Sequence, residues 1–163
     1  MRCATRIALD VLDALRAAHD AGIIHCDVRP SNIVVRESGR AVLIDWGLSR
    51  AAGAESRGCG VAAFADERVF LGCSYSARPV QDLCALLYTW LAAAHSAACA
   101  APWLAGAAEE ELYVNRSAWL QKARRSDRHV ASVAALLRKL LDAEIARERQ
   151  HDAVQEVLQG IVG

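Results

Sequence analysis

The sequence predicts a mainly α-helical domain that contains one small β-hairpin. Two segments, Ile7–Ala21 and Val130–Ile145, place apolar residues at three- and four-residue steps, which is typical of amphipathic helices. A third segment, Gln81–Leu91, is apolar on every face, which indicates a buried central helix. Two short β-prone runs, Ile33–Val35 and Ala41–Ile44, flank a turn and predict the hairpin.

Composition limits the class of protein. The 163 residues are 54% hydrophobic, which favours one globular domain over residues 1–163. Nineteen basic and nineteen acidic residues cancel, so neither nucleic acid nor an anionic membrane is an expected partner. The longest apolar segment, Leu83–Ala94, is shorter than the roughly 18 residues that span a bilayer. Without a signal peptide or a C-x-x-C pair, we expect an intracellular protein, cytoplasmic or nuclear, with reduced thiols.

The ends of these elements carry their own signals. Gly22 is a natural stop for the first helix, and Ile23-Ile24 then lead in extended form to His25. The predicted hairpin should bring Asn32, before its first strand, close to Asp45, after its second. A last helix is expected over Asp152–Val162. The tryptophans that we expect to anchor the core are Trp90, Trp103 and Trp119.

Two polar motifs stand between these apolar elements. The first is His25-Cys26-Asp27-Val28-Arg29-Pro30-Ser31-Asn32, and the second is Asp45-Trp46-Gly47. Carboxylate and amide oxygens are the ligands that Mg²⁺ prefers. In order and spacing the two motifs resemble H-R-D-L-x-x-x-N and D-F-G of the protein kinase family, in its serine/threonine-like form.

The resemblance implies roles for four residues. Asp27 would accept or orient the proton of a substrate hydroxyl, and Arg29 would contact phosphate in place of the usual lysine. Asn32 would complete the catalytic set, and Asn32 and Asp45 would hold Mg²⁺. Arg29, Asn32 and Asp45 would therefore bind the cofactor, Mg²⁺ with ATP. His25 is expected to be a buried framework residue.

The resemblance extends beyond the two motifs. It divides the chain into a catalytic loop (25–32), a metal motif (45–47) and an activation-type segment (48–67), and Leu15–His25 resembles the helix that leads into the loop. Gly60–Glu67 matches the end of the activation segment in part, since Asp66 stands in place of proline. Asp82 resembles the aspartate that anchors the catalytic loop, and it could also cap its helix.

The sequence contains no G-x-G-x-x-G and no recognisable strand lysine or paired glutamate. The expected fold is therefore a protein-kinase-like C-lobe that lacks the β-rich N-lobe. We expect part of a protein kinase whose full-length form transfers phosphate from ATP to a Ser/Thr hydroxyl of a protein substrate, while the isolated chain is inactive. The alternatives are an inactive pseudokinase or docking module that binds a regulatory protein, and a small-molecule phosphotransferase of the aminoglycoside type. The sequence predicts no oligomeric state.

Overall fold

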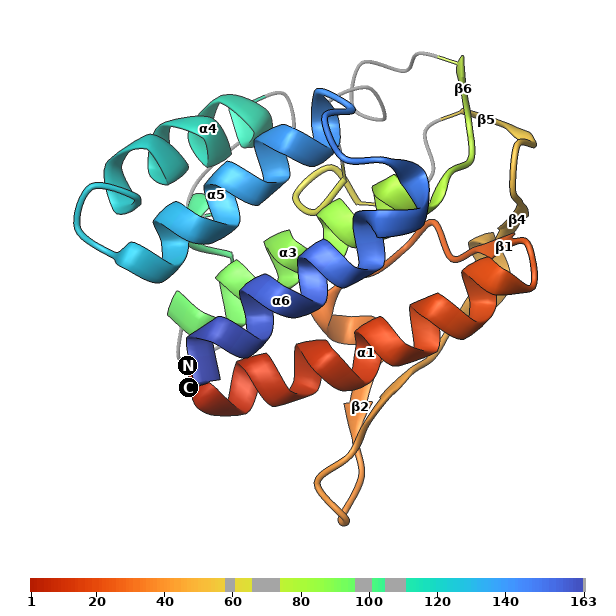
Figure 1. Ribbon diagram of the computed structural model, residues 1–163, viewed down its shortest axis with the longest axis horizontal. Helices are drawn as coiled ribbons and strands as arrows, with labels where there is room; N and C mark the ends of the chain where they lie inside the picture. The colour runs from red at the N-terminus through yellow and green to blue at the C-terminus, as the bar shows by residue number, and fades with distance from the viewer. Residues whose placement is uncertain (58–60, 66–73, 96–100, 105–110, 163) are drawn as a thin grey trace.

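The structure, a computed structural model, describes residues 1–57, 61–65, 74–95, 101–104 and 111–162. It is mainly helical, and its strands form small two-stranded sheets, so the predicted fold class is confirmed (Figure 1). The α-helices are α1 (Arg2–Asp20), α3 (Pro79–His95), α4 (Leu112–Ala123), α5 (Arg128–Leu141) and α6 (Gln150–Val162). Short 3₁₀ turns connect them at η1 (Pro30–Asn32), η2 (Trp46–Leu48), η3 (Pro102–Leu104) and η5 (Arg147–Arg149).

Helix α3 is the centre of the core, as its uniformly apolar sequence predicts. Helices α1, α5 and α6 all pack against it, and α1 and α6 also lie side by side (Figure 1). Its buried side chains include Leu83, Leu87 and Trp90, and the indole N–H of Trp90 donates to the hydroxyl of Thr5 at 3.0 Å. That bond satisfies the polar atom of a buried indole and fixes α1 against α3.

Helix α1 carries the predicted apolar stripe on its buried face, but it begins at Arg2 rather than at Ile7. The stripe starts earlier than the sequence pattern suggested, because Ala4 and Thr5 are buried as well. The helix ends at Asp20, and Gly22 follows with φ of +75°. This left-handed conformation suits glycine, and it turns the chain toward His25.

The predicted hairpin is present. Strand β2 (Ile33–Val35) pairs antiparallel with β3 (Ala41–Leu43), and Ile33 lies opposite Leu43. The amide of Ala41 donates to the Asp10 carboxylate at 2.8 Å, which ties the hairpin to α1. In Figure 1 the hairpin projects from the helical body below α1.

The expected activation-type segment contains short strands that its sequence did not predict. Strand β4 (Arg50–Ala51) pairs with β1 (Ile23–Ile24), and β5 (Glu55–Arg57) pairs with β6 (Ser74–Ser76). Both pairings are antiparallel and join residues far apart in the chain, so the apolar pattern of either partner alone could not reveal them. Gly60, Asp66 and Glu67 of the expected segment end lie outside the described residues.

Helix α5 begins at Arg128 and α6 at Gln150, each two residues before its predicted start, and the larger difference is at the end of α5. Helix α5 ends at Leu141 instead of Ile145, because Ala143 adopts φ of +56° and breaks the helical path. Ile145 nevertheless packs against the core. Helix α6 covers the predicted Asp152–Val162.

Helix α4 has no counterpart in the sequence analysis, because its buried residues, Leu112 and Arg116, form no apolar stripe. The tryptophans predicted as anchors do pack inward: Trp90 and Trp103 are buried, and the ring of Trp119 lies 5.4 Å from that of Trp103. Among the described helices, none has both the length and the apolar content that crossing a bilayer requires.

Candidate active site

The His25–Asn32 loop begins where β1 ends, and the buried side chain of His25 packs beneath the loop. The His25 side chain is fully buried, with its ring in edge contact with Trp46 at 4.5 Å between centroids. Its Nδ1 accepts the amide proton of Asp27 at 3.2 Å, so Nε2 carries the ring proton and donates to the carbonyl of Ile44 at 3.1 Å. Both ring nitrogens are occupied, as expected of a framework residue and not of a base.

Asp82 anchors this loop from α3. Its carboxylate is buried and accepts the amide of His25 at 2.7 Å and the amide of Cys26 at 2.9 Å. Cys26 has φ of +68°, a conformation that costs a non-glycine residue roughly 1 kcal/mol or more. The two charge-assisted hydrogen bonds offset that cost, so they hold the turn that presents Asp27. Both oxygens of Asp82 thus serve groups outside its own helix, which bears out the predicted anchor.

Asp27 is gathered into a polar cluster with two other motif residues. Its Oδ2 accepts from Nδ2 of Asn32 at 2.8 Å and from Nε of Arg29 at 3.1 Å. Among the described residues, no hydrogen bond reaches its Oδ1. The side chain is almost completely buried, and the adjacent Arg29 guanidinium forms an ion pair with it. One oxygen is therefore held in place while the other is left to accept a proton from an incoming hydroxyl.

The hairpin brings Asn32 beside the second motif. The carbonyl of Asn32 accepts the amide of Ile44 at 2.8 Å, which places Asp45 next along the chain. Asp45 is exposed and adopts φ of +62°, and from the described residues it receives only a long hydrogen bond, from Gly47 at 3.4 Å. A Cβ at position 47 would lie 3.3 Å from the Asp45 carboxylate, so glycine leaves this oxygen room.

The donor set suits a hard cation. Asn32 uses its amide nitrogen on Asp27, which leaves its Oδ1, and Asp45 offers a nearly free carboxylate. Within the described part of the chain no three His, Cys, Asp or Glu side chains gather as a metal site. A cation held by Asn32 and Asp45 would therefore take its other oxygens from water and phosphate, as Mg²⁺ commonly does.

The four predicted residues thus lie within one region, and the sequence analysis missed one residue behind them. His19 on α1 contacts Asp82, with its Nε2 2.9 Å from Oδ2. The available signal was helical spacing, because His19 lies four residues after the buried Leu15 and so shares its face. A histidine on the buried face of a helix needs a hydrogen-bond partner, and where none lies nearby in the sequence the partner must come from a distant segment.

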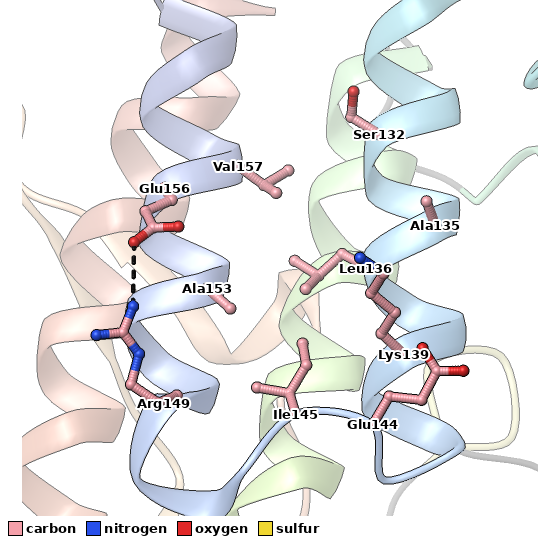
Figure 2. A pocket seen from close by; sticks show the side chains of 10 residues that line it. All are labelled: Ser132, Ala135, Leu136, Lys139, Glu144, Ile145, Arg149, Ala153, Glu156 and Val157. Atoms are coloured by element: carbon pink, nitrogen blue, oxygen red, sulfur yellow. Dashed lines mark ion pairs between the residues drawn. The ribbon is translucent and has the colours of Figure 1, made fainter.

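A concavity between α5 and α6 lies apart from this cluster (Figure 2). It encloses about 410 Å³ and is lined by both signs of charge, including Lys139 and Glu144. Its arginine, Arg149, is paired with Glu156 at 3.6 Å and with Asp152 at 3.8 Å. None of the motif residues lines it, so the candidate site remains the cluster around Asp27.

Comparison with known proteins finds likeness to protein kinases over part of the chain. Residues 1–78 match the family model described as protein kinase domain. A probable serine/threonine-protein kinase PknB of Corynebacterium glutamicum is 48% identical over 48 residues, which is 29% of this chain and 7% of that protein. The serine/threonine-protein kinase PknL of Mycobacterium tuberculosis is 50% identical over 46 residues, 28% of this chain and 12% of that protein. The matched stretches are therefore a small part of each relative.

Among solved structures, the kinase PK-1 of the Cydia pomonella granulovirus superposes with a TM-score of 0.48 and 25% sequence identity. The superposition covers 54% of this chain and 33% of the viral protein.

Proposed function

Since residues 1–78 match the family model described as protein kinase domain, we propose that this chain supplies the catalytic half of a serine/threonine protein kinase site. The reaction would transfer the terminal phosphoryl group of ATP to a protein Ser or Thr hydroxyl. The observation that carries the proposal is the state of Asp27, which is buried, is oriented by Arg29 and Asn32, and has an Oδ1 to which no described residue donates.

The proposed roles follow from the contacts. Asp27 orients the substrate hydroxyl through Oδ1 and receives its proton, while Asn32 keeps the carboxylate from rotating. Arg29 donates to Asp27 through Nε, and no described residue binds its terminal nitrogens, which would contact a phosphate oxygen. Oδ1 of Asn32 and the Asp45 carboxylate would hold Mg²⁺. When bound, Mg²⁺ with ATP supplies the phosphoryl group and neutralises the charge that develops on it.

A partner segment must cover the nucleotide. The chain spans 3 to 12% of the length of the curated kinases that it matches, and no Gly-rich phosphate loop occurs in its sequence. The apolar surface beside the site is consistent with such a covering partner, because Val34, Val35 and Trp46 are all more than a third exposed. We therefore propose activity for the protein in which these residues are joined to a β-rich lobe.

The same surface favours a second candidate function, a non-catalytic docking module. Exposed Val34 and Val35 on the hairpin and Trp46 beside it would then contact a regulatory protein. On this view the contacts around Asp27 would be retained without turnover. The two functions differ in whether Asp27 matters for phosphate transfer.

A phosphotransfer assay of the longest naturally expressed protein that contains residues 1–163 tests the proposal. We expect Mg²⁺-dependent transfer from ATP to Ser/Thr peptides and to neither aminoglycosides nor choline, with Asp27→Asn reducing the rate by a factor on the order of 10² or more. An Asp13→Asn variant on the exposed face of α1 is the matched control. Peptide phosphorylation that is unaffected by Asp27→Asn would overturn the proposed role, and absence of both transfer and ATP binding would favour the docking module.

A further inference from the structure

Three helices meet at one buried histidine behind the candidate site. His19 at the end of α1 has its Nε2 2.9 Å from Oδ2 of Asp82 on α3, and its Nδ1 2.8 Å from Nε2 of His151 on α6. The side chains of His19 and Asp82 are each only 2% exposed. A continuous hydrogen-bonded path therefore runs from His151 through His19 and Asp82 to the amides of His25 and Cys26.

Proton positions along this path follow from its chemistry. An ionised Asp82 can only accept, so the proton of His19 that faces it must lie on Nε2. Nδ1 of His19 and Nε2 of His151 then share a single proton between them. His151 is neutral in this pair, because burial, followed by the charges of His19 and Arg16, lowers its pKa to about 4.

The groups around His151 come from each element packed against it. His19, Arg16 and Asp20 face it from α1, and Asp152 is its neighbour on α6. Arg147 and Glu148 of η5 line, together with His151, a polar pocket of about 410 Å³ that is separate from the concavity between α5 and α6. Arg16 is itself held by Asp152 at 3.1 Å, so it does not compete for the ring nitrogen of His151.

We propose that His151 is a positioning residue for the His25–Asn32 loop. By occupying Nδ1 of His19, it fixes the orientation of that ring, so that Nε2–H stays on Asp82 and the Asp82 carboxylate stays on the amides of His25 and Cys26. The inference deepens the proposed function, because Asp27 follows these two amides directly. It assigns the C-terminal helix a role in shaping the site.

Loss of His151 would remove the hydrogen-bond partner of His19 Nδ1 and so allow the His19 ring to change its orientation. Nδ1 of His19 would then face the polar pocket, where water could replace the lost partner and the imidazole could rotate. Rotation would take Nε2–H away from Asp82. The Asp82 carboxylate, which holds the strained turn at Cys26, would then accept two hydrogen bonds instead of three. The amides of His25 and Cys26 should then open more often to solvent.

Nuclear magnetic resonance of the 163-residue protein tests the path without any need for activity. In the unmodified protein we expect a proton on Nε2 of His19 and a scalar coupling across the His19 Nδ1 to His151 Nε2 hydrogen bond. We expect His151→Phe, which keeps a ring but has no ring nitrogen, to speed amide exchange at His25 and Cys26 about tenfold. His151→Gln should restore slow exchange, because its side-chain amide can reach the position of Nε2.

His129→Phe on α5 is the matched control, and it should leave exchange at the loop unchanged. A missing coupling in the unmodified protein would overturn the inference even if His151→Phe does not fold. So would unchanged exchange at His25 and Cys26 in a folded His151→Phe protein. Failure of the proposed function alone would look different, because the coupling and the exchange effect would persist while no form of the natural protein transferred phosphate.

Discussion

The side-chain amide of Asn32 donates to Asp27 twice, to the carboxylate at 2.8 Å and to the backbone carbonyl at 2.9 Å. Because both donated protons point to Asp27, the remaining oxygen of Asn32 is directed away from the carboxylate. One buried amide thereby orients the proposed base and presents an oxygen of the kind that Mg²⁺ takes. A carboxylate or an apolar side chain at position 32 could not do both.

Asn32→Asp should therefore destabilise the fold as well as the site. The substitution would place a second carboxylate oxygen where the amide donor now lies 2.8 Å from Asp27. Since both groups are buried, we expect the free energy of unfolding to fall by about 2–4 kcal/mol at pH 7 and to recover in part as the carboxylates are protonated. Urea unfolding measures this, with Asn115→Asp on α4 as the control. A loss no greater than that of the control would contradict the arrangement.

Asp82→Asn should loosen the His25–Asn32 loop. The carboxylate accepts from His25, Cys26 and His19, whereas an amide has one acceptor oxygen and would turn its NH₂ group toward a donor. We expect a loss of about 2–4 kcal/mol in the free energy of unfolding and faster exchange at both loop amides. Asp10→Asn, which keeps an acceptor for Ala41, should cost much less. Equal losses would show that Asp82 is no special anchor.

The grouping of the candidate site's residues was predictable because it is local in sequence. Asp27, Arg29 and Asn32 share one loop, and the hairpin that links Asn32 to Asp45 has short strands and a short turn. Neither feature depends on how the helices pack. The buried face of α1 and the buried helix α3 were likewise visible as apolar patterns of helical period.

The supports behind the site could not be predicted, because they join distant elements. His19 and His151 are far apart in the chain and meet only once α1 and α6 have packed together. Arg116 is buried by tertiary contacts, although its type is usually exposed and its helix lacks an apolar stripe. The end of α5 was misplaced because Ala143 adopts a left-handed conformation that alanine rarely takes.

Stability should fall as the pH is lowered from about 6.5 to about 4. His151 has its pKa lowered to about 4 by burial and by the charges of His19 and Arg16, so the unfolded chain binds a proton in this window that the folded chain does not. Burial also lowers the pKa of His95, which acts in the same direction. Allowing for solvent screening, we expect His151 to contribute a loss on the order of 1–2 kcal/mol.

Urea unfolding between pH 7 and pH 4.5 measures this loss. The Asp127 carboxylate caps α5. Burial would raise its pKa, but the amides of Val130 and His129 lower it overall, so the chosen pH interval stays above the range in which Asp127 gains its proton. His151→Gln removes the titrating group and should flatten the pH dependence, whereas His129→Gln should preserve it. An equal pH dependence in the natural protein and His151→Gln would contradict a neutral, buried His151.

Arg116 should prove to be the residue that holds the last part of the expected activation-type segment (48–67) in place. Its Nη1 donates to the carbonyls of Ala63 and Ala65 at 3.2 and 2.6 Å, and its guanidinium carbon lies 3.9 Å from the ring centre of Tyr88. Arg116→Met would remove the side-chain donor from the Ala65 carbonyl and leave the Ala63 carbonyl with the indole N–H of Trp103 at 2.9 Å, so we expect the free energy of unfolding to fall by about 2–4 kcal/mol.

The distinguishing measurement is a comparison of three substitutions by urea unfolding and by proteolysis near Ala63. Arg116→Lys keeps the charge but places one ammonium where a planar guanidinium bridges carbonyls and stacks on an aromatic ring, so we expect it to recover only part of the loss. Arg125→Met, in the exposed turn after α4, should change neither stability nor cleavage. If Arg116→Lys were as stable as the natural protein, charge alone would explain the contact, and the bridging geometry would have no role.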